Sequence, residues 1–141
     1  MVDDTVIVSV EQEGDGNTGN LFGIDSKTGD VRWQNPRNPS QGAPYATPLV
    51  NRTEDGKNEI IFSSSSHGFT SLDPKTGSRN WELGNLFPLR CVTSPIRVGD
   101  MVLATCGTGG GDKSAVAVRL PSRTKGQNPE MVYRIPKGVS Y

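Results

Sequence analysis

One ten-residue phrase occurs twice in this chain, and its repetition constrains the fold more than any other feature. Residues 24–33 read Ile-Asp-Ser-Lys-Thr-Gly-Asp-Val-Arg-Trp, and residues 72–81 read Leu-Asp-Pro-Lys-Thr-Gly-Ser-Arg-Asn-Trp. Every matched position is displaced by 48 residues, as from Asp25 to Asp73. A fixed period of about 20 to 50 residues is typical of proteins built from repeated structural units. We therefore expect a modular chain.

The residues of each unit favour β-strands joined by tight turns. A run of β-branched residues at 5–10 precedes the first phrase, and a comparable run precedes the second. In the turn of each phrase, we expect the side chain of Asp25 or Asp73 to accept hydrogen bonds from backbone N–H groups. Gly29 or Gly77 would supply the positive φ that closes a hairpin with a bulge. The tryptophan then lies on the next strand.

A third unit follows, with a different turn. Pro48 in the second unit is matched 47 residues later by Pro95. Three further strand-like runs cover residues 100–105, 114–118 and 130–135. The Asp-x-Lys-Thr-Gly turn is missing from this unit and is replaced by a longer connection from Pro121 to Pro129. Tyr133 occupies the position that holds tryptophan in the first two units.

Four short antiparallel strands over about 48 residues are typical of one blade of a β-propeller. A β-sandwich is the alternative, but it does not explain the period. We therefore predict an all-β fold, a partial β-propeller of about three four-stranded antiparallel blades. The boundaries are about 1–41 for blade 1, which lacks its first strand, 42–88 for blade 2, 89–137 for blade 3, and 138–141 for the start of blade 4.

Three blades cannot close a ring, which needs about 4 to 8. We therefore interpret residues 1–141 as a single fragment of a larger propeller, in which Met1 is an internal start. An isolated arc of blades would leave its two terminal sheet faces uncovered, which favours aggregation or pairing with missing sequence. The rest of the propeller is accordingly one expected partner.

The pattern Asp-x-Lys-Thr-Gly-x-x-x-Trp resembles the repeat of the PQQ-binding-like, or quinoprotein-like, β-propeller proteins, where PQQ is pyrroloquinoline quinone. The resemblance covers essentially the whole chain and is closest to the BamB-like branch of the family. It implies a ring of seven or eight blades. It also implies that Trp33 and Trp81 dock neighbouring blades together, with Tyr133 as a weaker substitute, and that the protein is periplasmic or otherwise in the cell envelope.

Composition excludes some partners. Lys plus Arg equals Asp plus Glu at 15 each, so the chain has no net field to attract a polyanion, and we expect no nucleic-acid binding. No apolar run approaches the roughly 20 residues of a transmembrane segment. The N-terminus shows no basic region followed by an apolar core, so no signal peptide is visible.

Cys91 and Cys106 flank a predicted hairpin and could form a disulfide in an oxidising compartment. A two-residue turn at Val98-Gly99 would place the thiols opposite each other, whereas a turn at Gly99-Asp100 would make them diagonal neighbours. Packing of small, reduced cysteines in the core is the commoner arrangement. In either case the expected role is structural.

Other motifs have weaker functional interpretations. The segment 107–114 nearly matches a phosphate-binding loop, but Asp112 stands where glycine is required and a strand follows instead of a helix. His67 follows four serines without the third group that a hydrolytic triad needs. The acidic segments 13–17 and 54–59 lack the full spacing of a calcium loop. One histidine and two cysteines cannot supply four good zinc ligands.

Two functions remain. The first is a non-catalytic propeller module that acts as a protein-interaction or assembly scaffold and binds a protein partner through its loops, with no cofactor. The alternative is a fragment of a PQQ- and calcium-dependent alcohol or sugar dehydrogenase whose active site lies in missing blades. Cys91 and Cys106 are not the vicinal pair of many such enzymes, and Asp25 and Asp73 belong to the repeat turns. No catalytic, cofactor-binding or metal-binding residue is assigned, and we prefer the scaffold.

Overall fold

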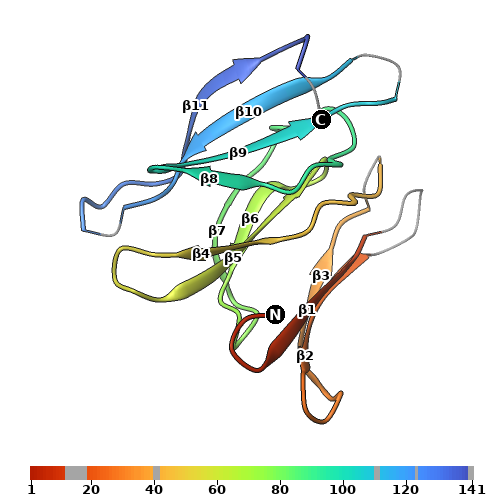
Figure 1. Ribbon diagram of the computed structural model, residues 1–141, viewed down its shortest axis with the longest axis vertical. Helices are drawn as coiled ribbons and strands as arrows, with labels where there is room; N and C mark the ends of the chain where they lie inside the picture. Colours follow the sequence, from red (N-terminus) through yellow and green to blue (C-terminus); the bar gives the residue numbers. More distant parts are fainter. Residues whose placement is uncertain (12–18, 40–41, 110–111, 123, 140–141) are drawn as a thin grey trace.

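The chain folds into antiparallel β-sheets stacked along the molecule (Figure 1). The computed structural model describes residues 1–11, 19–39, 42–109, 112–122 and 124–139. The first sheet comprises β1 (Thr5–Val10), β2 (Gly19–Asp25) and β3 (Val31–Arg37). The second comprises β4 (Leu49–Arg52), β5 (Asn58–Ser64), β6 (Gly68–Leu72) and β7 (Arg79–Leu83). The third comprises β8 (Ile96–Val98), β9 (Met101–Cys106), β10 (Ser114–Arg119) and β11 (Glu130–Ile135).

In each sheet the strands lie in chain order, so every sheet is an antiparallel meander. β1 is the counterpart of β5 and β9. Each of these strands pairs with the strand that leads into the repeat turn or, in the third unit, into the connection that replaces that turn. The described part of the first sheet has no counterpart of β4 and β8. This arrangement confirms the predicted all-β fold and its partial β-propeller architecture.

The apolar core lies between the sheets, and strand β5 shows why. Side chains alternate between the two faces of a strand, so a strand buried on both faces reads as a continuous apolar run. Ile60 and Phe62 belong to the cluster that also contains Leu21 of the first sheet. Ile61, between them, belongs to the cluster that contains Val116 of the third sheet. The second sheet is therefore covered on both faces.

The second and third sheets approach one another at their first strands, where β4 contacts β8. Arg97 on β8 joins these strands: its Nη1 donates to Asn51 Oδ1 at 2.7 Å and to the carbonyl oxygen of Arg52 at 2.8 Å. Such convergence is the geometry of neighbouring propeller blades around a common axis.

The two repeat turns have the same geometry. Asp25 Oδ1 accepts hydrogen bonds from the backbone N–H groups of the residues two and three positions later, at 2.8 and 3.1 Å. Asp73 Oδ1 accepts the equivalent pair at 2.7 and 3.2 Å. Gly29 and Gly77 have φ values of +80° and +70°. Only glycine adopts this left-handed backbone without strain, which explains its place in both phrases.

Cys91 and Cys106 face each other as an isolated antiparallel bridge between the third sheet and the segment before β8. The β8–β9 turn is Gly99-Asp100, because Val98 pairs with Met101. If the β8–β9 register continued, Cys91 and Cys106 would be diagonal neighbours. The register shifts before β8, however, so the two cysteines lie directly opposite each other. Both are buried free thiols in this structure.

Parts of some sequence motifs lie outside the described residues: the acidic segment 13–17, the glycines at 110–111, and Tyr141 at the predicted start of blade 4. In the described ranges, no helix has the length and apolar character needed to cross a membrane.

Candidate functional site

Trp33 on β3 shows how one repeat unit docks on the next. The side chain is buried, and its indole Nε1 donates a 2.9 Å hydrogen bond to the carbonyl oxygen of Pro74 in the turn of the second unit. A Cβ atom on Gly77 would lie 2.6 Å from the indole ring, and one on Gly23 would lie 2.2 Å away. The ring therefore fills space that both glycines leave open. Asn35, also on β3, donates to the carbonyl oxygen of Gly77 at 3.1 Å.

Trp81 on β7 holds the equivalent position but makes a different contact. Its Nε1 donates to Glu59 Oε2 at 3.2 Å, within the same sheet, and the side chain is only half-buried. Two sequence differences account for this. Ser71 pairs with Trp81 where Gly23 pairs with Trp33, so the indole has less room against its own sheet. The third unit also lacks the turn on which Trp81 would dock.

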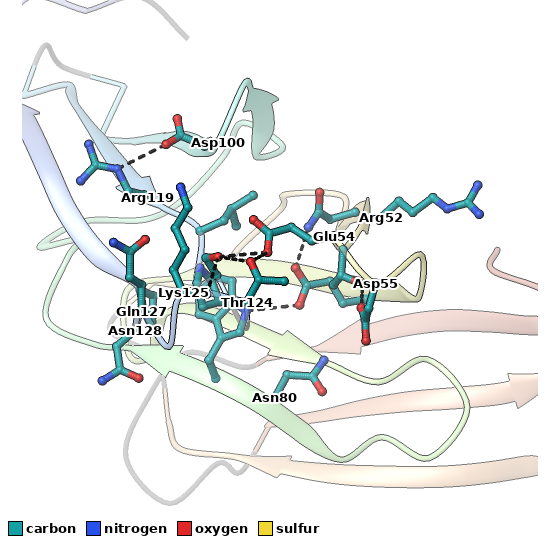
Figure 2. Close-up of a pocket in the computed structure, with 18 of the residues that line it drawn as sticks. Arg52, Glu54, Asp55, Asn80, Asp100, Arg119, Thr124, Lys125, Gln127 and Asn128 are labelled. Carbon is teal, nitrogen blue, oxygen red and sulfur yellow. Dashed lines mark hydrogen bonds and ion pairs between the residues drawn. The ribbon is translucent and has the colours of Figure 1, made fainter.

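A groove of about 390 Å³ occupies the place of that missing contact, between the second and third sheets. Figure 2 shows its walls: the β4–β5 hairpin turn on one side and the connection from β10 to β11 on the other. Trp81 and Asn80 line it from β7. The groove is thus a direct consequence of the altered third repeat.

Glu54 links the two walls of this groove by hydrogen bonds. Its Oε2 atom accepts hydrogen bonds from Thr124 Oγ1 at 2.9 Å and from Ser122 Oγ at 3.0 Å (Figure 2). These bonds, that from Thr124 first, hold the pKa of Glu54 below its usual value. The connection of the third unit is therefore attached to the β4–β5 turn by charge-assisted hydrogen bonds.

The wall beside Trp81 is a hydrogen-bonded network centred on the buried Glu59. Its carboxylate accepts from Asn51 Nδ2 at 2.6 Å, from Ser71 Oγ at 2.6 Å and from the Trp81 indole. Asn51 in turn accepts from Arg97 of the third sheet. A buried carboxylate with several donors fixes the side chains around it. The indole of Trp81 is accordingly held in one orientation at the groove.

Charges of both signs surround the groove opening. Arg119 forms an ion pair of 3.3 Å with Asp100, and Arg52, Asp55 and Lys125 lie nearby (Figure 2). Exposed ion pairs of this kind contribute little to stability. A half-buried aromatic side chain with amides and charges of both signs around it is suited to binding the surface of another molecule.

No family model and no curated protein matches this sequence. Among solved structures, BamB from Moraxella catarrhalis is similar, with a TM-score of 0.52 and 17% sequence identity over 94% of this chain. This chain has a BamB-like β-propeller fold. It spans 33% of the length of that BamB chain.

The repeat aspartates of this BamB-like propeller are committed to their own turns. The Asp25 carboxylate also accepts from Arg32 Nε at 3.1 Å, and this bond, followed by those from the turn N–H groups, lowers the pKa of Asp25 to about 2. So acidic a carboxyl is a poor general base near neutral pH. Asp73 has the equivalent turn bonds.

The described residues offer no ligand cluster for the calcium ion of a PQQ site. In the described ranges, no group of three or more His, Cys, Asp or Glu residues could hold a metal ion. The carboxylates of Asp25 and Asp73, which are the acids the repeat supplies, are occupied by backbone N–H groups.

His67 is a structural link in this fold. Its Nε2 accepts a 3.0 Å hydrogen bond from the backbone N–H of Asn38, and its Nδ1 lies 3.3 Å from Glu82 Oε2. Burial, and then the nearby Arg37 guanidinium, lowers the pKa of His67. Because Nε2 accepts a hydrogen bond, the imidazole is neutral. Nε2 joins the second unit to the first through Asn38, whereas Nδ1 contacts Glu82 on β7 of its own unit.

A buried ion pair between Glu11 and Arg37 was missed by the sequence analysis. Arg37 Nε lies 2.9 Å from Glu11 Oε1, and both side chains are almost fully buried. Arg37 Nη1 also donates to Thr70 Oγ1 of the second sheet at 3.0 Å. The pair lies at the opposite end of the strands from the repeat turns. Single charged residues at strand ends carry no periodic signal, so the pattern could not reveal the pair.

Proposed function

We propose that this chain is part of a non-catalytic, PQQ-like β-propeller that serves as a protein-interaction or assembly scaffold in the bacterial envelope. The observation that carries the proposal is the groove at Trp81, where an inter-blade contact has been replaced by an accessible, preorganised surface. The BamB-like fold supports an envelope scaffold by analogy.

The partner is proposed to be a protein that contacts the loops at this end of the blades. The groove offers an aromatic side chain, the exposed amides of Gln127 and Asn128, and charges of both signs. Aromatic anchors surrounded by a polar rim are typical of protein-binding surfaces. Fixed geometry at Glu54 and Glu59 lowers the entropy that binding costs. On this proposal the chain needs no cofactor.

The proposal is tested by photo-crosslinking in envelope preparations of the source cells. A photoreactive amino acid at Gln127, in the groove, should give one defined protein adduct. The same group at Asn38, at the other end of the strands, should not give that adduct. Trp81→Ala should abolish crosslinking from Gln127 if the indole is the anchor. Adducts that are identical from both positions would contradict a specific surface.

A second measurement separates the scaffold from the dehydrogenase. The complete propeller of which this chain is proposed to be part is titrated with PQQ in the presence of calcium, while tryptophan fluorescence is followed and alcohol-dependent dye reduction is assayed. The scaffold predicts neither saturable quenching nor dye reduction. Saturable binding with turnover would replace the proposed function by the dehydrogenase.

A further inference from the structure

The two cysteines of this chain lie directly opposite each other. The sequence of 141 residues contains Cys91 and Cys106 and no other cysteine. Cys91 lies in the connection from β7 to β8, Cys106 is the last residue of β9, and the two form an antiparallel bridge. Both side chains are 0% exposed. Side chains of directly opposed residues lie on the same face of a sheet, so the two thiols are neighbours in the core.

The repeat does not require a cysteine at either position. Pro44 lies 47 residues before Cys91, which is the repeat offset found for this segment. The pairing of β4 with β5 and of β8 with β9 aligns Cys106 with Ser64. The second unit thus builds the same part of the fold without a sulfur atom. Core packing alone therefore does not account for the meeting of both cysteines in the third unit.

The backbone around the pair has the geometry that a disulfide between neighbouring strands needs. The N–H of Gly107 donates to the carbonyl oxygen of Arg90 at 3.0 Å, so this hydrogen bond joins residues that flank the pair. Cys91 and Cys106 are therefore a non-hydrogen-bonded pair, in which opposed Cα atoms lie about 4.5 Å apart and the side chains approach closely. Disulfides span Cα separations of about 4.4 to 6.8 Å. The pair can thus be bridged without a change of register.

A bond at this place joins the second unit to the third. Both cysteines belong to the apolar cluster that contains Ile61 of the second sheet and Val116 of the third. The backbone N–H of Tyr45, in the segment before β4, donates to the carbonyl oxygen of Cys91 at 3.0 Å. A covalent link from Cys91 to β9 therefore ties the connection between these two units to the third sheet.

We propose that Cys91 and Cys106 form a disulfide that fixes the β7–β8 connection to β9 when the protein folds in an oxidising environment. One cysteine thiolate attacks a sulfur atom of a small external disulfide, such as oxidised glutathione, and releases one glutathione thiol. The thiolate of the other cysteine then displaces the second glutathione. The two cysteines lose two electrons and two protons, and the external disulfide gains them to become two thiols.

Burial determines when this bond forms. An external disulfide does not reach fully buried sulfur atoms, and burial also raises the pKa of the Cys91 thiol, which keeps its reactive thiolate scarce. Oxidation therefore belongs to folding, before the core closes over the pair. The same burial afterwards shields the disulfide from reductants.

The inference does not rest on the proposed scaffold function. Cys106 is at the far end of β9 from Asp100, which lines the groove at Trp81. The proposed envelope location would supply an oxidising compartment. Refolding in a glutathione buffer sets the redox conditions directly, however, so the test stands without that location.

Refolding of the complete protein that contains this chain tests the bond. Reduced protein in urea is diluted into buffers with a series of reduced-to-oxidised glutathione ratios, and a parallel sample stays in urea. Iodoacetamide then blocks free thiols in unfolded protein, and trypsin cuts after Arg90 and Arg97. Mass spectrometry should detect peptide 91–97 linked to peptide 98–113. The ratio of linked to unlinked peptide should be at least about tenfold higher after refolding, because the fold brings the thiols together.

Urea unfolding shows whether the bond suits the fold. Oxidised wild-type protein should unfold at a higher urea midpoint than the same protein treated with dithiothreitol. Cys91→Ala and Cys106→Ala should each show one midpoint under both conditions. Backbone hydrogen exchange in residues 92–94 should slow on oxidation in the wild type alone. The linked-peptide ratio needs no variant, so it decides even where an alanine substitution prevents folding. Equal ratios in refolded and unfolded samples, or a lower midpoint after oxidation, overturn the proposal.

Discussion

The indole Nε1 of Trp33 donates a 2.9 Å hydrogen bond to the carbonyl oxygen of Pro74, in the repeat turn of the next unit. The equivalent indole of Trp81 donates to Glu59 of its own sheet instead. One motif thus serves two purposes: at the first interface it docks two units, and at the second it lines a groove. The difference comes from the partner turn, which the third unit has lost.

The two tryptophans should therefore differ in their contribution to stability. Trp33→Ala removes a buried side chain and should lower the free energy of unfolding by about 3 to 5 kcal/mol. The milder Trp33→Phe leaves the Pro74 carbonyl unpaired and should cost about 1 to 3 kcal/mol. Trp81→Ala should cost clearly less than Trp33→Ala, because its side chain is half-exposed. Urea unfolding measures all three, and equal losses for the two alanine variants would contradict the docking role.

The two turn glycines separate backbone strain from docking. Gly29→Ala and Gly77→Ala both force alanine into positive φ, at a cost of about 1 to 2 kcal/mol. Gly77→Ala also drives a methyl group into the Trp33 ring, which should add about 1 to 3 kcal/mol. Urea unfolding of the two single variants compares these costs. In a Trp33→Ala background the extra cost at Gly77 should vanish, and its persistence would assign the cost to another contact.

Strand content and the repeat units could be predicted because they follow local patterns. The period of the phrase identified the units, and the continuous apolar run at 60–62 is what a strand covered on both faces requires. The groove could not be predicted, since it depends on a serine for a glycine at position 71 and on a missing turn in a different unit. Cys91 and Cys106 lie opposite each other because of a register shift that the residue pattern does not predict.

Asp25 should make stability depend on acid pH. Its pKa is lowered to about 2, chiefly by the hydrogen bond from Arg32. A group whose folded pKa is depressed stabilises the fold above its unfolded pKa of about 4, and that contribution is lost as pH falls from about 4 to about 2. Carbon-detected NMR titration reports the carboxyl directly. Arg32→Ala should raise the pKa of Asp25, and an unchanged titration would show that the turn N–H groups alone set it.

The cysteine pair should be protected from alkylation in the native protein. Burial raises the pKa of the Cys91 thiol, and the neighbouring Cys106 raises it further. Because the thiolate is the reactive form, iodoacetamide should modify both residues far more slowly in the folded state than in urea. Mass spectrometry counts the modified residues. Fast native modification of Cys91 would contradict the burial seen here. Protein from an oxidising compartment that shows no free thiol even when unfolded would establish the disulfide that the sequence allows.

Glu54 should limit the mobility of the groove wall but contribute little to the stability of the fold. Glu54→Gln weakens the charge-assisted bonds from Thr124 and Ser122, which attach the β10–β11 connection to the β4–β5 turn. Because Glu54 and Thr124 are exposed, the free energy of unfolding should change by less than about 1 kcal/mol. Hydrogen exchange of the backbone in residues 124–129 should nevertheless become faster, while exchange in β5 and β6 stays unchanged. The exposed Lys57→Gln, three residues later in the same turn, serves as the matched control and should leave exchange in 124–129 as in the wild type. Faster exchange throughout the second sheet would show instead that Glu54 stabilises the blade itself.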